Sequence, residues 1–547
     1  MKRIVFALCL TVVAQTPDEI RTRMTGLEKQ SDPDIAIFVK AADWALRHPE
    51  EKTSVLNTLA LLDLGKTRAS RNAVEQERGR VPRGYRSRVD GSVQPYLIHV
   101  PESYDPKKPS RLDVVLHGRA TGMTEVSFLT AKKTEPKQPD YLVLEVFGRT
   151  NNAYRWAGET DVFEALDAVR KHYNVDPDHI YLRGFSMGGA GAWHIGLHYP
   201  DRWAGMEAGA GFVETVNYAK RSDVPEWERS AMHIYDALDY APNAVDLAVV
   251  GYGGEIDPQL KASTLIREAV ENLPGLNALF LVGPQTAHKF HPDSKARSEE
   301  FLNKQTRHAP EDLRFTTYTA RYDECFGVKI VSLQKMYEKA SVERKGSAVT
   351  TSNVVELEFA APFSGTIDGQ EVGQGTRYAF RAGKWRKVGS FSGLRKRHGL
   401  QGPIDDAFMD SFVTVNPPEE FRSLWDKWMR GTLPEGKPDA SRNVVVFGDY
   451  TDPYIAKALP KLPVKWTRNE ISVAGQKFAS EGNTLALIYP NPQNPSHYLV
   501  LNSGHTFGEK DFIGTNALLY PRLGDWAVIR KADHTVVASG FFNADWK

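Results

Sequence analysis

The sequence contains very little cysteine: Cys9 and Cys325 are the only two thiols among 547 residues. Cys9 lies in an apolar N-terminal stretch that we expect to be removed, which leaves Cys325 alone. An intramolecular disulfide is then excluded, so the folded state has to be stabilised by the packing of its cores.

The sequence also lacks an excess of charge of either sign. Its 69 basic and 68 acidic residues give a net charge of +1, and the two signs are interspersed. This is not the pattern of a nucleic-acid-binding surface, so we expect no nucleic-acid partner. Beyond the N-terminus no segment approaches the roughly 20 apolar residues that span a bilayer, so we expect no membrane association of the processed protein.

Residues 1–14 have the pattern of a secretory signal peptide. Met1, Lys2 and Arg3 provide a basic start, an apolar stretch follows to Ala14, and the sequence turns polar at Gln15. Such a segment is removed on export, which predicts a secreted or periplasmic protein.

The most informative motif is Gly-Phe-Ser-Met-Gly at residues 184–188. It follows the apolar run 180–182 and precedes a glycine- and alanine-rich segment that favours a helix. A serine on a sharp strand-to-helix turn needs small neighbours, because the backbone bends tightly there. The pattern predicts a nucleophile elbow that exposes the hydroxyl of Ser186.

Two later loops supply the other groups that such a serine requires, in the order nucleophile, acid, histidine. The loop after the apolar run 245–251 carries Glu255 and Asp257, and the loop after the run 278–283 carries His288 and His291. We take Asp257 as the acid with Glu255 in reserve, and His288 as the base with His291 in reserve. Asp257 could also cap a helix that starts near residue 258.

A third turn, Leu-His-Gly-Arg at residues 116–119, follows another predicted strand and is typical of an oxyanion hole. The chemistry needs two backbone N–H groups directed at the oxygen that becomes charged. We assign them to Met187 and to Gly118 or Arg119, and expect His117 to bind the loop backbone. In the mechanism that these groups imply, His288 activates Ser186, Asp257 orients His288, and no metal or organic cofactor is required.

The length allows several domains, and the pattern of the sequence changes along the chain. We expect a helical segment at 15–84, an α/β-hydrolase catalytic domain with a mainly parallel sheet at 85–306, and a β-rich module at 310–398. Alternating strands and helices in residues 399–547, called the C-terminal domain below, predict a flavodoxin-like α/β domain.

The segment 88–198 resembles secreted α/β-hydrolases of the prolyl-oligopeptidase and polyhydroxybutyrate-depolymerase-like esterase groups. The resemblance rests on Asp-Gly-Ser at 90–92, Leu-His-Gly-Arg at 116–119 and Gly-Phe-Ser-Met-Gly-Gly at 184–189. Residues 399–408 look like a C-terminal extension found in large members of this group. The resemblance implies the α/β-hydrolase fold and leaves both ester and peptide hydrolysis open.

Prolyl oligopeptidases carry a large β-propeller ahead of the hydrolase, whereas this chain has only a short helical segment there. We therefore expect a hydrolase of aryl, feruloyl or acetyl esters, whose substrate is a small ester or an ester on a polysaccharide. A prolyl-oligopeptidase-like serine peptidase is the alternative. A second alternative is a secreted glycan-binding protein whose hydrolase unit has decayed.

Overall fold

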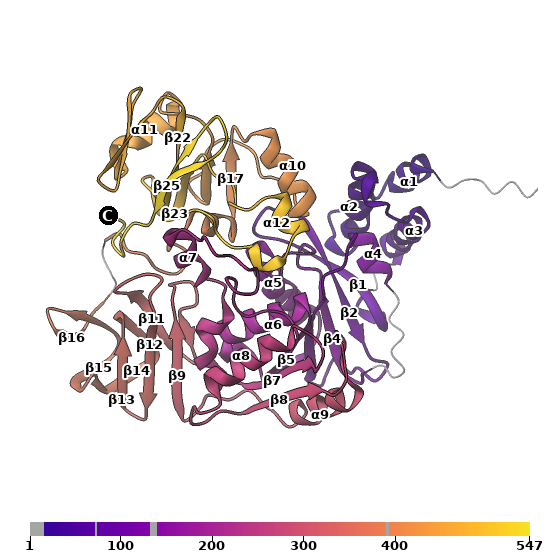
Figure 1. Cartoon of the computed structure of the whole chain (residues 1–547). Helices are drawn as coiled ribbons and strands as arrows, with labels where there is room; N and C mark the ends of the chain where they lie inside the picture. The colour runs from indigo at the N-terminus through magenta and orange to yellow at the C-terminus, as the bar shows by residue number, and fades with distance from the viewer. Residues whose placement is uncertain (1–15, 72–73, 132–138, 390–392) are drawn as a thin grey trace, which may run out of the picture.

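The computed structural model describes residues 16–71, 74–131, 139–389 and 393–547. The expected signal peptide, residues 1–14, lies outside the described residues. Figure 1 shows three sheet-containing regions: the hydrolase, a β-rich sheet beside it, and the C-terminal domain above both. In the described ranges no helix is both long and apolar enough to cross a membrane.

The hydrolase is built on an eight-stranded sheet in the order β1-β2-β4-β3-β5-β6-β7-β8. Strands β1 and β2 are antiparallel to their neighbours, and β4, β3, β5, β6, β7 and β8 run parallel. The strands are β1 (Gly79–Arg86), β2 (Val93–Val100), β3 (Ser110–Leu116), β4 (Leu142–Val146), β5 (Val175–Phe185), β6 (Gly205–Gly209), β7 (Ala248–Gly254) and β8 (Ala278–Gly283). The carboxyl ends of the parallel strands therefore meet at one edge, where the loops that follow them gather.

Helices cover both faces of this sheet. Strand β5 shows why: Leu182 packs into the core shared with α5, α6 and α8, whereas the adjacent Tyr181 packs on the opposite face with Leu302 of α9. The helices are α4 (Glu125–Thr130), α5 (Ala157–His172), α6 (Met187–His198), α7 (Glu226–Met232), α8 (Leu260–Val270) and α9 (Pro292–Leu302). Covered faces explain the continuous apolar runs of these strands.

Three helices precede the sheet: α1 (Pro17–Met24), α2 (Pro33–Arg47) and α3 (Val55–Arg71). The expected boundary at residue 84 was placed too late, because β1 already begins at Gly79. A buried ion pair joins the two parts, since the Arg83 guanidinium of β1 donates to Asp34 of α2 at 2.6 Å. The arginines of β1, one of which makes this contact, interrupt its apolar pattern and conceal the strand in the sequence.

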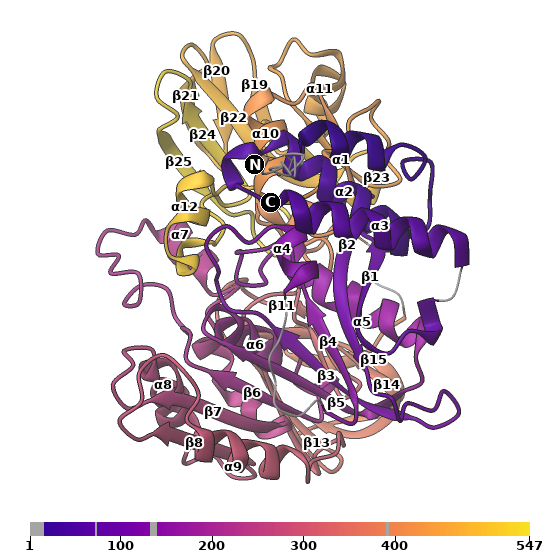
Figure 2. The same ribbon diagram turned by 90° about the vertical axis from the view of Figure 1, so that its right-hand side faces the viewer.

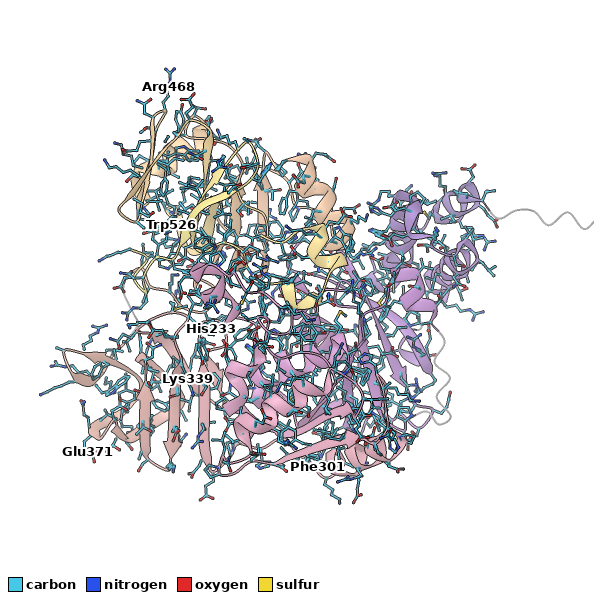
Figure 3. The ribbon with its side chains drawn as sticks, viewed as in Figure 1. His233, Phe301, Lys339, Glu371, Arg468 and Trp526 are labelled. Atoms are coloured by element: carbon cyan, nitrogen blue, oxygen red, sulfur yellow. The ribbon has the colours of Figure 1, made fainter. Side chains whose placement is uncertain are left out.

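The β-rich module forms a second eight-stranded sheet, with β10-β11-β14-β13-β12-β9 in one path, β15 joined to β14, and β16 joined to β15. Its strands are β9 (Asp312–Thr317), β10 (Glu324–Cys325), β11 (Val328–Leu333), β12 (Ala340–Lys345), β13 (Ala348–Ser352), β14 (Val354–Ile367), β15 (Gln370–Arg381) and β16 (Lys384–Lys387). Most of its pairs are antiparallel. Glu371, labelled in Figure 3, lies at its outer end.

The C-terminal domain contains a six-stranded sheet in the order β17-β18-β23-β22-β24-β25. The strands are β17 (Phe412–Val415), β18 (Asn443–Val446), β22 (Asn483–Asn491), β23 (Asn494–Leu501), β24 (Trp526–Arg530) and β25 (Val536–Gly540). A small sheet holds β19 (Val464–Trp466), β20 (Glu470–Val473) and β21 (Gln476–Ala479), and the helices are α10 (Glu419–Trp428), α11 (Pro453–Ala458) and α12 (Glu509–Ile513).

This domain is not flavodoxin-like, so that prediction was wrong. Only β17, β18 and β23 are mutually parallel, while β22, β24 and β25 pair antiparallel. A flavodoxin-like sheet is parallel throughout, and each parallel connection needs a crossover of a dozen or more residues. The two residues between β22 and β23 allow only a hairpin, which reverses the chain.

The C-terminal domain packs directly on the carboxyl edge of the hydrolase sheet. One continuous apolar core includes residues of both, such as Trp156 and Tyr235 of the hydrolase and Phe507 of the C-terminal domain. In Figures 1 and 2, α12 lies between the sheet of the C-terminal domain and the hydrolase. The strand-end loops of the hydrolase are therefore covered in part by the end of the same chain.

Candidate active site

Ser186 lies at the turn between β5 and α6, where the sequence pattern places it. Its backbone has φ 60° and ψ −121°, a combination that L-residues rarely adopt. The turn is held on both sides, because the Ser186 N–H donates to Gly209 O at 2.9 Å and the Ala190 N–H donates to Ser186 O at 2.9 Å. The side chain is partly exposed at this turn.

The glycines around Ser186 are required by close backbone contacts. A Cβ on Gly184 would lie 2.0 Å from Gly188 O, and one on Gly188 would lie 2.0 Å from Leu116 O. Both contacts are with backbone that has no room to move. The motif Gly-x-Ser-x-Gly therefore follows from the packing of β5, α6 and the end of β3.

Asp257 and His288 form a hydrogen-bonded pair in the loops after β7 and β8. His288 Nδ1 lies 2.7 Å from Asp257 Oδ2. The Asp257 side chain is 3% exposed and the His288 side chain is 42% exposed. Asp257 also accepts a hydrogen bond from the Gln259 N–H at 2.9 Å. It does not cap a helix, as the sequence suggested it could, because α8 begins only at Leu260 and its N-cap is Gln259. A buried carboxylate thus orients an imidazole whose other edge is accessible.

The two reserve residues have other partners. The Glu255 carboxylate accepts from the backbone N–H and the side-chain amide of Gln285 at 2.7 and 3.0 Å, and it ties two loops together. His291 is the N-cap residue before α9, and its N–H donates to the hydroxyl of Tyr252 at 2.8 Å. Neither is joined to the Asp257–His288 pair by a hydrogen bond of the described residues.

The His288 ring reaches the turn that carries Ser186, although β6 and β7 lie between β5 and β8 in the sheet. The ring of Phe185, the residue before Ser186, has its centroid 4.8 Å from that of the His288 ring. Among the described residues, no hydrogen bond joins the Ser186 hydroxyl to His288. Such bonds are often long in free enzymes and shorten when substrate binds.

On the other side of Ser186 lies the turn after β3. A Cβ on Gly118 would be 3.6 Å from Ser186 Cβ and 3.4 Å from Phe185 O, so the backbone of Gly118 passes close to the serine. Met187 is the first residue of α6, and the first N–H groups of a helix have no partner within it. The backbone of Gly118 and the first residue of α6 therefore both lie next to Ser186.

His117 binds backbone carbonyl groups, as expected from the sequence. Its Nδ1 lies 2.9 Å from Gly118 O and its Nε2 lies 3.0 Å from Phe147 O. The main chain of His117 is fixed as well, because its N–H donates to the Tyr154 hydroxyl at 2.6 Å. His117 thus connects the turn after β3 to the loop after β4.

Two residues near the mouth were missed by the sequence analysis. The Gln259 side chain accepts from the Gly211 N–H at 2.9 Å and donates to the Tyr218 hydroxyl at 3.3 Å. Burial raises the pKa of Tyr218, as does the charge of Asp257, while the charge of Arg119 lowers it. Through Gln259, Tyr218 is therefore connected to the loop that carries Asp257. In the sequence, only the position of Tyr218 in the segment after β6 could have indicated that it lies near the site.

Metal-binding geometry is absent from the part of the chain that the structure describes: no three His, Cys, Asp or Glu side chains are grouped to hold an ion.

Residues 151–246 match the model of the prolyl oligopeptidase family. This stretch runs from the loop after β4, through Ser186, to the residues before β7. Over this stretch the hydrolase domain is similar to the prolyl oligopeptidase family. The domain is an α/β-hydrolase, and the protein is a serine hydrolase with this similarity.

Solved structures of both esterases and peptidases are similar to the hydrolase domain of this protein. A fluorophosphonate-binding serine hydrolase of Staphylococcus aureus matches at 16% identity and TM-score 0.32, over 41% of this chain and 96% of that one. A ferulic acid esterase matches at 18% identity and TM-score 0.31, over 41% and 96%. An acylaminoacyl peptidase of Pyrococcus horikoshii matches at 16% identity and TM-score 0.33, over 43% and 44%. No curated protein sequence matches the chain significantly.

Proposed function

We propose that this serine hydrolase cleaves carboxylic esters through an acyl-enzyme on Ser186. The observation that carries the proposal is the Asp257–His288 pair, at 2.7 Å, beside the strained turn that presents Ser186. A histidine whose outer edge is accessible and whose inner nitrogen is bound to a buried carboxylate is poised to accept a proton. In this proposal Asp257 orients the imidazole and stabilises its charged form.

The reaction proceeds in two halves. His288 takes the proton of the Ser186 hydroxyl as the oxygen attacks the ester carbonyl, and the N–H groups of Met187 and of Gly118 or Arg119 bind the resulting oxyanion. His288 then gives its proton to the leaving alcohol. A water molecule, deprotonated by His288, attacks the acyl-enzyme, and the acid and free Ser186 are released.

Esters are favoured over peptides because of what surrounds the hydrolase. The C-terminal domain, which is not a β-propeller, covers part of the carboxyl edge of the hydrolase sheet. Aryl, feruloyl or acetyl esters, free or on a polysaccharide, are the proposed substrates. Peptidase activity is the second candidate, and the family match over residues 151–246 favours it.

A comparison of kcat/KM on an aryl acetate and on a Pro-linked aryl amide tests the proposal. We expect faster turnover of the ester, and a loss of both activities in Ser186→Ala with the melting temperature unchanged. Amide cleavage that exceeds ester cleavage would favour the peptidase. Undiminished ester hydrolysis by Ser186→Ala would rule out Ser186 as the nucleophile.

The expected export from the cell remains part of the proposal. The N-terminal sequence of the protein exported by its native host tests it: a start near Gln15 supports a cleaved signal peptide, and a start at Met1 refutes it.

A further inference from the structure

The turn after β3 is tied to the C-terminal domain through the side chain of Arg119. Its guanidinium donates hydrogen bonds to the carbonyl oxygens of Phe512, Ile513 and Gly514. These carbonyls end helix α12, where the helix dipole favours a cation. The residue that follows Gly118 is therefore held by a segment almost 400 positions later in the chain.

A second connection reaches the same turn through Asn151. The Asn151 side chain forms two hydrogen bonds with the backbone of Ala120, accepting from its N–H at 3.2 Å and donating to its carbonyl at 2.8 Å. The carbonyl of Asn151 in turn accepts from the side chain of Asn516 in the C-terminal domain at 2.8 Å. Asn516 is 5% exposed and makes no other side-chain hydrogen bond within the described residues.

The loop that contains Asn151 has an unusually strained backbone. Five non-glycine residues have φ between 51° and 75°, and each is at most 2% exposed: Arg149, Thr150, Ala153, Tyr154 and Trp156. A left-handed conformation costs an L-residue about 1 kcal/mol or more, so this loop persists only if its surroundings stabilise it.

The C-terminal domain supplies much of that stabilisation. The Arg155 side chain donates to Leu519 O at 2.5 Å, and the Arg149 side chain donates to Met429 O at 3.0 Å. The Trp156 ring stacks on Phe507 with centroids 3.6 Å apart. The strained loop therefore lies between the C-terminal domain and the turn after β3, in contact with both.

We infer that the C-terminal domain is a structural part of the oxyanion hole. Residues 512–519 position the backbone of Gly118 and Arg119 directly through the Arg119 side chain, and indirectly through Asn516 and the loop 149–156. Arg119 and Asn516 are positioning residues in this account. The inference rests on the proposed function, because it assigns the C-terminal domain a role in the chemistry at Ser186.

The test compares Arg119→Met and Asn516→Ala with Thr160→Val in the full-length protein. Thr160 is a matched control, since its buried hydroxyl also donates to a carbonyl of the C-terminal domain, Met409 O, at 2.9 Å. Within the described residues its hydroxyl forms no hydrogen bond with the turn after β3 or with the loop 149–156, and the backbone hydrogen bond from its N–H to Trp156 O is kept in Thr160→Val. The measurements are kcat and KM on p-nitrophenyl acetate, the melting temperature, and the inhibition constant of an aryl trifluoromethyl ketone. That ketone forms a tetrahedral adduct whose anionic oxygen occupies the oxyanion hole.

We expect kcat to fall about 10- to 100-fold in Arg119→Met and Asn516→Ala, with KM changed less than about threefold, because a donor displaced by about 1 Å loses much of its effect in the transition state. The inhibition constant should rise by the factor by which kcat/KM falls. Arg119→Lys should recover part of the loss, and Thr160→Val should change only the melting temperature.

The inference is wrong if Asn516→Ala keeps wild-type kcat and inhibitor affinity, or if Thr160→Val loses as much of both. Should Arg119→Met not fold, Asn516→Ala alone decides, because it removes one hydrogen bond and leaves the charge unchanged. Failure of the proposed function looks different: Ser186→Ala would then retain the esterase activity, whatever the positioning variants do.

Discussion

The two sides of the Ser186 hydroxyl are built differently. On the proton-transfer side, Asp257 and His288 come from loops after adjacent strands, and their 2.7 Å hydrogen bond needs no residue outside the hydrolase. On the oxyanion side, the turn with Gly118 and Arg119 is held by residues 512–519 and by a strained loop. One side is thus self-contained, whereas the other depends on the C-terminal domain.

This difference indicates which parts of the chain can be substituted without loss of catalysis. Parallel neighbouring strands bring their carboxyl ends together, so loops after β7 and β8 meet in any sheet of this topology. A buried loop with five left-handed residues has no such general cause, and it needs partners that are particular to this chain. Changes in the C-terminal domain are therefore expected to act on oxyanion binding before proton transfer.

The largest fall in kcat, on the proton-transfer side, is expected for His288→Ala. Removal of the base should lower kcat by about 10⁵-fold, because Ser186 then has no group to accept its proton. The measurement is steady-state hydrolysis of p-nitrophenyl acetate, with the melting temperature as a control for folding. If the activity falls less than tenfold, His288 is not the base, and His291→Ala should be measured next.

The next largest fall in kcat is expected when the acid that orients His288 is substituted. Asp257→Asn should lower kcat by about 10³- to 10⁴-fold, since an amide cannot stabilise the charged imidazole. Glu255→Gln is the matched control: its carboxylate bonds to Gln285, so we expect less than a threefold change. The reverse ranking in kcat measurements would transfer the role of acid to Glu255.

A smaller effect concerns the stability of the C-terminal domain. His505 is 7% exposed, both of its ring nitrogens lack hydrogen-bond partners among the described residues, and burial lowers its pKa to about 3. Its ring packs against those of Phe421, Trp425 and Phe507. Between pH 3 and the unfolded value of about 6.5 the unfolded chain binds more protons, so stability is lost as the pH falls through this window.

His505→Leu removes the titrating group and therefore the loss of folding stability at low pH. Compared with the wild type, the variant should be about as stable at pH 7.5 and gain about 1.4 kcal/mol relative to it at pH 5.5, one unit below the unfolded pKa. Thermal unfolding at the two pH values measures the difference. An equal difference at both values would show that protonation of His505 does not act on folding.

Much of the self-contained side could be predicted from the sequence. The elbow at Ser186 follows from glycines at 184 and 188, where a Cβ would meet backbone oxygens at 2.0 Å. The order of Ser186, Asp257 and His288 along the chain follows from strand ends that meet at one edge. The pattern could not choose between Asp257 and Glu255, because the two carboxylates differ only in where the loop directs them.

The oxyanion side and the C-terminal sheet could not be predicted in the same way. An apolar run such as residues 484–488 fits a parallel and an antiparallel strand equally, and only the hairpin between β22 and β23 fixes its direction. The contact between Asn516 and the carbonyl of Asn151 joins one side chain to a backbone atom 365 residues away. Such a contact produces no periodic pattern in the sequence, and a residue of any type could supply the backbone carbonyl.

The central claim is that Ser186 is the nucleophile, and covalent labelling tests it most directly. The wild-type protein and Ser186→Ala are treated with a fluorophosphonate and digested, and the labelled peptide is located by mass spectrometry. The account predicts one phosphonyl group, on Ser186, and an unlabelled variant. A label on any other residue, or equal labelling of Ser186→Ala, would contradict it.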